Sequence, residues 1–269
     1  MPLPLPRRAY VDGPFGQIHY RYLGQGKPIV LLHQAPMTSN QFDYVYPELA
    51  ARGFQAIGID MPGFGMSDGT PDVPTVQDYA RVVPPVLDAL DIASAAVGGH
   101  HTGALVSAEA AVRFPDRVSA VILNGPAMFD AADRAAFMTG LHQRELGLVP
   151  APSAAHMVDI FNTRDRLAAG TVPVERLSDY VVQALVGQSP YWHGHYAAFH
   201  YEMEPTLRAI TQPTLILTNT GDMIHDHAHR ARALRPDFAW HALEGGGIDI
   251  VDQQPAAWAD AVADFLRAL

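Results

Sequence analysis

The stretch Ala95–Gly103, AAVGGHHTG, decides the fold of this chain. Its first five residues are small or apolar, as in a strand that is buried on both faces, and its glycines permit a sharp turn. The residues from Thr102 to Phe114 then predict a helix. The strand–turn–helix unit therefore places His101 at the apex of the turn, in the frame Gly99-x-His101-x-Gly103.

Strand-like and helix-like segments alternate on both sides of this stretch. This alternation predicts an α/β protein with a mostly parallel, doubly wound sheet and right-handed crossovers. Besides the strand that begins the stretch Ala95–Gly103, strands are expected at 16–22, which opens a hairpin or forms an edge, and at 28–32, 55–59, 118–123, 214–218 and 239–243. The helices are expected at 41–51, 76–90, 102–114 and 256–269.

One region interrupts the alternation. Residues 129–205 are rich in helix-forming residues and prolines and contain no convincing strand, and the sheet pattern resumes after them. We therefore predict a core domain formed by 1–128 and 206–269, with 129–205 inserted as a helical cap. Insertions above the strand ends commonly act as lids over a binding site.

Composition narrows the classes of partner. The formal charge of −10 argues against nucleic acid and anionic membrane surfaces, and the absence of cysteine excludes disulfides and thiolate chemistry. The amino-terminal MPLPLPRR lacks the apolar core of a signal peptide, and no segment approaches the ~20 apolar residues of a membrane helix. We expect a cytoplasmic protein that binds a small-molecule substrate. The sequence leaves open whether the protein forms a homodimer.

Four stretches together resemble the α/β-hydrolase superfamily, in its capped epoxide-hydrolase-like or C–C-hydrolase-like branch. They are Leu31–Pro36, close to an H-G-x-P turn; Asp60–Asp68, close to D-x-P-G-F-G-x-S-D; Ala95–Gly103; and Leu217–Asp222. The resemblance covers essentially the whole chain. It implies that 95–103 is a nucleophile elbow, G-x-S-x-G, and that Asp222 occupies the position of the catalytic acid.

Two of the three catalytic positions depart from the family pattern. His101 stands where the nucleophile is expected, and the position of the usual histidine base, seven residues before Pro255, is Ile248. A slip of one residue would place Asp249 there instead. We hypothesise that the longer side chain of His101 fills the space left by Ile248 and bonds to Asp222. The resulting His–Asp dyad would expose one imidazole nitrogen as a general base or acid.

Backbone donors of an oxyanion hole do not depend on side-chain identity. The resemblance assigns them to the amides of Gln34 and Thr102. Three functions follow. The first is hydrolysis of an ester, lactone or C–C bond by water that His101 activates. The second is a cofactor-free lyase, decarboxylase or isomerase reaction. The third is small-molecule binding without chemistry, because some receptors of this fold have an aliphatic residue in place of the catalytic histidine.

Most of the remaining histidines are expected to have structural roles or to lie in solvent. His33 is expected to brace the turn that carries an oxyanion donor, and His100 to be a packed structural residue. Of the tract that follows Asp222, we expect His225 to lie near the site and His227 and His229 to be solvated.

In the cap, aromatic residues and histidines cluster at 191–201. Such clusters often line a ligand pocket, and from this one we select Trp192, His193 and His200. A metal bound by His33, His101 and Asp222 was considered. No recognised ligand motif supports it, so no metal and no cofactor are expected.

Overall fold

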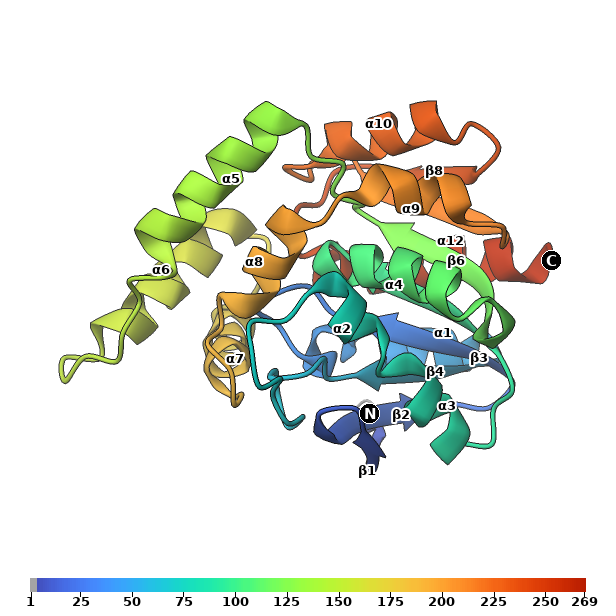
Figure 1. Cartoon of the computed structure of the whole chain (residues 1–269), viewed down its shortest axis with the longest axis horizontal. Coiled ribbons are helices and arrows are strands. Elements are labelled where there is room, and N and C mark those ends of the chain that lie inside the picture. Colours follow the sequence, from blue (N-terminus) through green and yellow to red (C-terminus); the bar gives the residue numbers. More distant parts are fainter. Residues whose placement is uncertain (1–3) are drawn as a thin grey trace.

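The computed structural model describes residues 4–269. Its centre is one eight-stranded sheet with the order β1-β2-β4-β3-β5-β6-β7-β8 (Figure 1). The pairs β1–β2 and β2–β4 are antiparallel, and the others are parallel. The strands are β1 (Arg7–Gly13), β2 (Gly16–Leu23), β3 (Lys27–Leu32), β4 (Phe54–Ile59), β5 (Ala95–His100), β6 (Val118–Asn124), β7 (Thr214–Asn219) and β8 (Ala239–Leu243).

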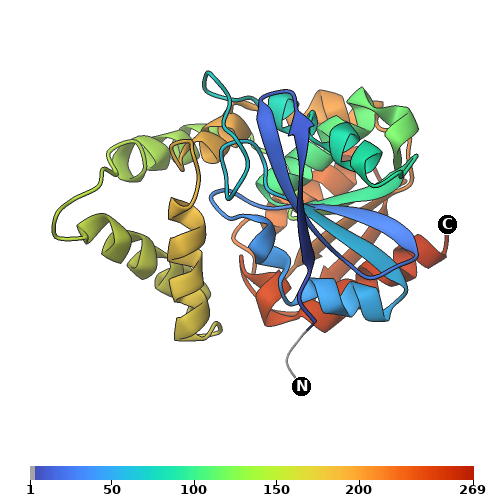
Figure 2. The same ribbon diagram turned by 90° about the horizontal axis from the view of Figure 1, so that it is seen from below.

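Helices cover both faces of the sheet, as expected for a doubly wound fold. Figure 2 shows α1 and α12 on one face and α2, α3 and α4 on the other. The helices are α1 (Val45–Ala51), α2 (Val76–Ala80), α3 (Val83–Ala89), α4 (Thr102–Arg113), α5 (Ala131–Arg144), α6 (Ala155–Ala168), α7 (Val174–Leu185), α8 (His193–His200), α9 (Met203–Ala209), α10 (His225–Leu234), α11 (Ile250–Gln253) and α12 (Pro255–Arg267), with 3₁₀ turns η1 (Ser39–Phe42) and η2 (Pro115–Arg117).

The core follows from the alternation of side chains along each strand. In β3, Val30 and Leu32 join the apolar cluster on one face of the sheet, whereas Ile29 and Leu31 join the cluster on the other. All four side chains are fully buried. A strand of this kind reads as a continuous apolar run because both of its faces are covered.

Two predicted helices differ from the observed ones. The helix expected at 76–90 is split into α2 and α3. Pro84 and Pro85 lack the N–H groups that would bond to the carbonyls four residues earlier, so the helix is interrupted. The helix expected at 41–51 begins as the 3₁₀ turn η1, and only Val45–Ala51 is α-helical.

The helices between β6 and β7 form a separate group. Helices α5, α6 and α7 extend away from the sheet, beside the carboxyl ends of the parallel strands (Figure 1). They have a small apolar cluster of their own, in which Leu177 and Tyr180 pack with Met37 of the core. None of the helices in residues 4–269 is both long enough and apolar enough to cross a membrane.

Candidate active site

His101 occupies the turn between β5 and α4 and has a strained backbone. Its φ is 49° and its ψ is −109°, a conformation that side-chain-bearing residues rarely adopt. The turn is tight because a Cβ atom on Gly103 would lie 1.9 Å from the carbonyl oxygen of Leu32. Backbone strain of this kind persists only where the surrounding structure holds it in place. The turn thus presents an imidazole at its apex.

The imidazole of His101 contacts the carboxylate of Asp222. Nε2 of His101 lies 2.7 Å from Oδ2 of Asp222, and Oδ1 of Asp222 accepts from the amide of Ile224 at 3.1 Å. Burial by itself would raise the pKa of Asp222. The charge and hydrogen bond of His101 overcome this and lower that pKa to about 2. Asp222 is therefore ionised at neutral pH, and Nε2 of His101 carries a proton that it donates.

Glycine at position 125, directly after β6, makes room for this pair. A Cβ atom there would lie 2.6 Å from Cδ2 of His101 and 3.0 Å from Oδ2 of Asp222. Its φ of 60° also favours glycine. Gly125 therefore belongs to the site, although no motif in the sequence singled it out.

His33 and His100 are fully buried, and their ring nitrogens are occupied. Nδ1 of His33 lies 2.9 Å from the carbonyl oxygen of Gln34, and Nε2 accepts from the amide of Met61. His33 thus braces the turn after β3. His100 stacks on His101 with ring centroids 4.2 Å apart, and its Nε2 lies 2.8 Å from the carbonyl oxygen of Ile248. Ile248 therefore meets the elbow through its backbone.

The turn after β3 differs from the sequence prediction. The amide of Gln34 donates to Oε1 of Gln41 at 2.9 Å, so it is not free to bind an oxyanion. Within residues 4–269, the amides of Ala35 and Thr102 have no acceptor. The structure thus departs from the sequence expectation for Gln34, because the side chain of Gln41 comes from a turn whose folding the motif does not encode.

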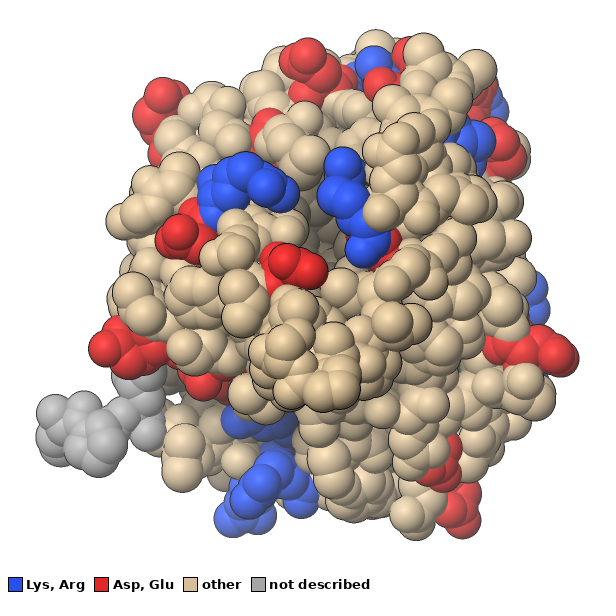
Figure 3. Space-filling view, turned by 90° about the vertical axis from the view of Figure 1, so that its left-hand side faces the viewer, with Lys and Arg blue, Asp and Glu red and all other residues tan. Residues whose placement is uncertain are grey.

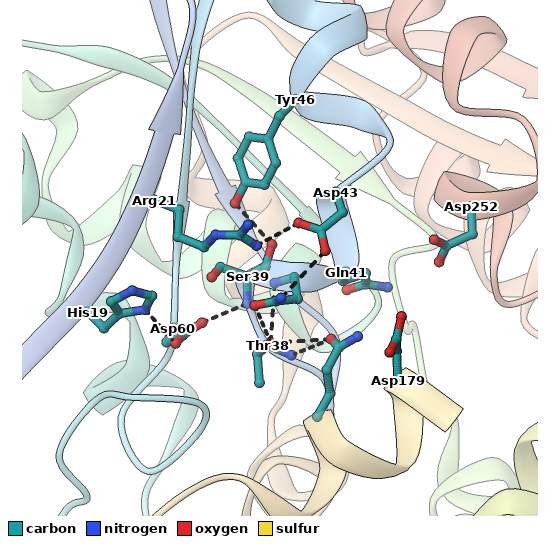
Figure 4. A network of polar contacts seen from close by, with 12 residues as sticks. His19, Arg21, Thr38, Ser39, Gln41, Asp43, Tyr46, Asp60, Asp179 and Asp252 are labelled. Carbon is teal, nitrogen blue, oxygen red and sulfur yellow. Dashed lines mark hydrogen bonds and ion pairs between the residues drawn. The ribbon is translucent and has the colours of Figure 1, made fainter. Parts of the chain in front are cut away.

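A network of polar contacts holds that turn. Figure 4 shows the carboxylate of Asp60 between the ring of His19 and the backbone of Ser39, at 2.8 and 2.7 Å. Thr38, in the same segment, contacts Gln183 of α7. The turn is therefore fixed from the sheet side by Asp60 and joined to the inserted helices by Gln183.

A buried ion pair that sequence reasoning missed joins α6 to the loop after β8. The guanidinium of Arg164 contacts Oδ1 of Asp249, and both residues are at most 5% exposed. Burial raises the pKa of Asp249, while Arg164 and His101 oppose that rise. Asp249 thus lies within electrostatic reach of the dyad. Arg164 gave no signal in the sequence because it is one of several arginines in a helix with exposed neighbours.

The cap cluster is only partly as expected. His193 is buried with Nδ1 unpartnered within the described chain, and Trp192 packs edge-on against it at 4.5 Å. His200, in contrast, is exposed and bonds to a carbonyl of its own helix. His195, from the same cluster, is half-buried. Its Nδ1 lies 2.8 Å from Oε2 of Glu145, and it also bonds to the backbone of Ala35.

Among the histidines after Asp222, His225 lies beside that residue, and its amide donates to the carbonyl oxygen of Asp222 at 3.0 Å. His225 contacts Thr218 at 3.0 Å and His229 at 3.1 Å through its ring nitrogens, and neither partner belongs to the dyad. His227 was expected in solvent but is 5% exposed. Burial lowers the pKa of His227, and the charge of His101 contributes to that lowering. The helical repeat of α10, not distance along the chain, decides which histidine faces the site.

One face of the molecule is hollowed. Figure 3 views the face on which α5, α6 and α7 lie and shows a hollow bordered by basic groups and an acidic one. A separate cavity of about 490 Å³ lies at the sheet edge, where His19, Arg21 and Asp60 contribute to its lining. None of the dyad residues lines that cavity.

A family model described as alpha/beta hydrolase fold matches residues 27–246. The chain belongs to the α/β-hydrolase fold family. An AB hydrolase superfamily protein of Bacillus subtilis is 27% identical over 217 residues, 75% of this chain and 76% of that protein. Bifunctional epoxide hydrolase 2 of Mus musculus is 32% identical over 140 residues, 47% of this chain and 25% of the enzyme. Several curated relatives are matched over less than two thirds of their own length.

The fold of this α/β hydrolase also agrees with solved structures. A bromoperoxidase from Bacillus anthracis superposes with a TM-score of 0.82 at 18% identity, over 97% of this chain and 100% of that one. At that identity the likeness shows the fold alone. The relatives named as hydrolases support a hydrolase family for this chain.

Proposed function

We propose that this α/β hydrolase cleaves an ester, lactone or C–C bond of a small organic substrate with water that His101 activates as general base. The observation that carries the proposal is the 2.7 Å contact between Nε2 of His101 and Oδ2 of Asp222. It gives the elbow residue the carboxylate partner that the base of a catalytic triad requires.

The protons of the dyad define which nitrogen reacts. Asp222 is ionised, so the tautomer of His101 with Nε2–H is stabilised and Nδ1 keeps its lone pair. Nδ1 has no partner within residues 4–269. A water molecule hydrogen-bonded to Nδ1 would lose its proton to the ring as its oxygen attacks the substrate. Asp222 then stabilises the imidazolium.

For an ester, the step balances without an acyl-enzyme. The water oxygen forms a bond to the carbonyl carbon, and the carbonyl oxygen becomes an oxyanion facing the free amides of Ala35 and Thr102. Collapse of this intermediate breaks the bond to the alkoxide, which takes the proton back from Nδ1 of His101. The products are an acid and an alcohol, and no cofactor takes part.

The same groups serve a second candidate function. A base and an oxyanion hole without a nucleophilic hydroxyl also suit a cofactor-free lyase, decarboxylase or isomerase that passes through an enolate. Incorporation of ¹⁸O from labelled water into the product separates the two, because only hydrolysis transfers a solvent oxygen. A third possibility, a binding protein, predicts ligand binding without turnover.

The test is a panel of p-nitrophenyl esters, lactones and vinylogous C–C substrates assayed with the purified protein. His101→Gln should lower kcat by ~10²–10⁴-fold, the usual contribution of a general base. The matched control is His142→Gln, which changes an exposed histidine of α5 and should leave kcat unchanged. Turnover of His101→Gln at the rate of the unmodified chain, or labelling by a serine-directed fluorophosphonate, refutes the proposal.

A further inference from the structure

His100, the neighbour of the dyad, has an unusual pair of hydrogen-bond partners. Its ring is fully buried and stacked on His101 at an interplanar angle of 26°. Nδ1 lies 2.8 Å from Oδ1 of Asn124, and Nε2 lies 2.8 Å from the carbonyl oxygen of Ile248. Both ring nitrogens therefore face an oxygen that accepts hydrogen bonds.

The orientation of the Asn124 amide is fixed by two other contacts. The indole Nε1–H of Trp258 donates to Oδ1 at 2.8 Å, and Nδ2 lies 3.4 Å from the carbonyl oxygen of Leu217. A flipped amide would set its NH₂ against the indole N–H and its oxygen against a carbonyl oxygen. Because both exchanges are unfavourable, Oδ1 is the atom that faces His100.

Two physical requirements conflict at this ring. Burial, followed by the charge of His101, lowers the pKa of His100 although Asp222 and the contacts with Ile248 and Asn124 oppose this, which favours a neutral ring. A neutral imidazole has one N–H, so one nitrogen would then direct its lone pair at an oxygen 2.8 Å away. Contacts of this length are typical of charge-assisted hydrogen bonds, and a buried lone-pair clash is costly.

We propose that His100 carries protons on both ring nitrogens and that this buried imidazolium is a positioning residue for His101. Its charge is balanced by Asp222, whose ionised form is favoured by both histidines. The two N–H groups hold β6, through Asn124, and the loop at Ile248 in a fixed relation to the elbow. The inference rests on the proposed function, in which His101 is the general base, and it assigns to His100 the task of holding His101 in place.

The charged groups that surround the two rings determine how a positive charge on His100 acts on His101. His101 is stacked on His100 from the elbow, Asp222 approaches from the loop after β7, and Asp249 follows Ile248 with its charge paired to Arg164. A cation 4.2 Å from His101 opposes a second positive charge. At effective dielectric constants from about 80 to 20, such a pair shifts a titration midpoint by roughly one to three pH units.

The direct test is nitrogen-15 NMR of the histidine side chains in the unmodified full-length protein, with the resonances of His100 assigned by their loss in His100→Gln. Both ring nitrogens of His100 should appear at the protonated position throughout the range in which free histidine titrates. A lone-pair nitrogen signal from either atom at neutral pH overturns the proposal. The measurement needs no substrate, so it stands apart from the failure or success of the proposed reaction.

Two variants extend the test. Trp258→Phe removes the donor that fixes Asn124, so the amide can flip and donate to Nδ1, and His100 should then become neutral at neutral pH. In His100→Gln, the midpoint of the acidic limb of the pH profile of kcat/KM should move to higher pH by roughly one to three units, because the neighbouring cation is gone. If circular dichroism shows that the variant is folded and the midpoint shifts by less than a tenth of the expected amount, the assignment of a protonated His100 is contradicted. A merely structural His100 would leave that midpoint unchanged.

Discussion

The ion pair between Arg164 and Asp249 supports the sharpest stability prediction. The two residues are 5% and 1% exposed, and they connect α6 to the loop that lies beside the dyad. Arg164 also lies 4.5 Å above the ring of Tyr180. Arg164→Met removes the cation and leaves a buried carboxylate without its partner. Truncation of one partner of a buried pair costs about 3–5 kcal/mol.

The magnitude depends on pH in a defined direction. Burial has already raised the pKa of Asp249 above its ordinary value, and the charge of Arg164 limits that rise. Without Arg164 the pKa of Asp249 rises further, and each pKa unit corresponds to about 1.4 kcal/mol in the free energy of unfolding. An acid whose folded pKa exceeds its unfolded pKa destabilises the protein above that pKa, and the deficit disappears as the pH falls through it. The deficit of Arg164→Met should therefore shrink on acidification.

Urea unfolding at about pH 7 and about pH 5, followed by tryptophan fluorescence, measures the effect. Asp249→Asn is a matched variant, because it breaks the same pair but leaves no carboxylate, so its deficit should not shrink at the lower pH. Arg166→Met, an exposed arginine on the same helix, should change the free energy of unfolding by less than about 0.5 kcal/mol. The double variant Arg164→Met with Asp249→Leu should recover much of the loss, since two apolar side chains replace the pair.

Two results would refute this reasoning. If both single variants lose less than about 1 kcal/mol, the pair is solvated and contributes as a surface ion pair does. If the losses of Arg164→Met and of Asp249→Leu, each measured alone, add in the double variant, the two side chains do not interact.

Four further predictions concern the dyad and the inserted helices. Asp222→Asn should lower kcat on the order of 10⁴-fold, because the amide no longer stabilises the imidazolium, and unchanged kcat would exclude Asp222 as the partner. His101→Gly should be more stable to urea than His101→Ala by about 1–3 kcal/mol, since glycine relieves the positive φ, and equal stabilities would show that the elbow is unstrained. Gly125→Ala should lower kcat by about 10²-fold through displacement of the dyad, and a fully active variant would contradict the 2.6 Å approach to His101. Although burial opposes it, Glu145 raises the pKa of His195. The loss of stability in His195→Gln should therefore be greatest below about pH 6.5 and should vanish as the pH rises through that raised pKa. A loss of stability that grows with pH would contradict this prediction.

The expectation that His101 bonds to Asp222 came from two local departures from a motif. These residues are 121 positions apart, yet their meeting could be inferred because parallel strands bring their carboxyl ends to one edge of the sheet. The strand and helix positions followed from periodicity in the same way. Errors arose where a side chain from another turn intervened, as Gln41 does at the amide of Gln34.

The sequence by itself determined the sheet, the elbow and the histidine at its apex, because strand periodicity and turn residues are local properties of the chain. The tertiary structure decided which groups surround that histidine. The partners of Asp249 and His195 lie 85 and 50 residues away and share no spacing with them. Buried ion pairs and unpaired amides depend on how helices pack above the sheet, and that packing is fixed by shape and burial across the whole molecule.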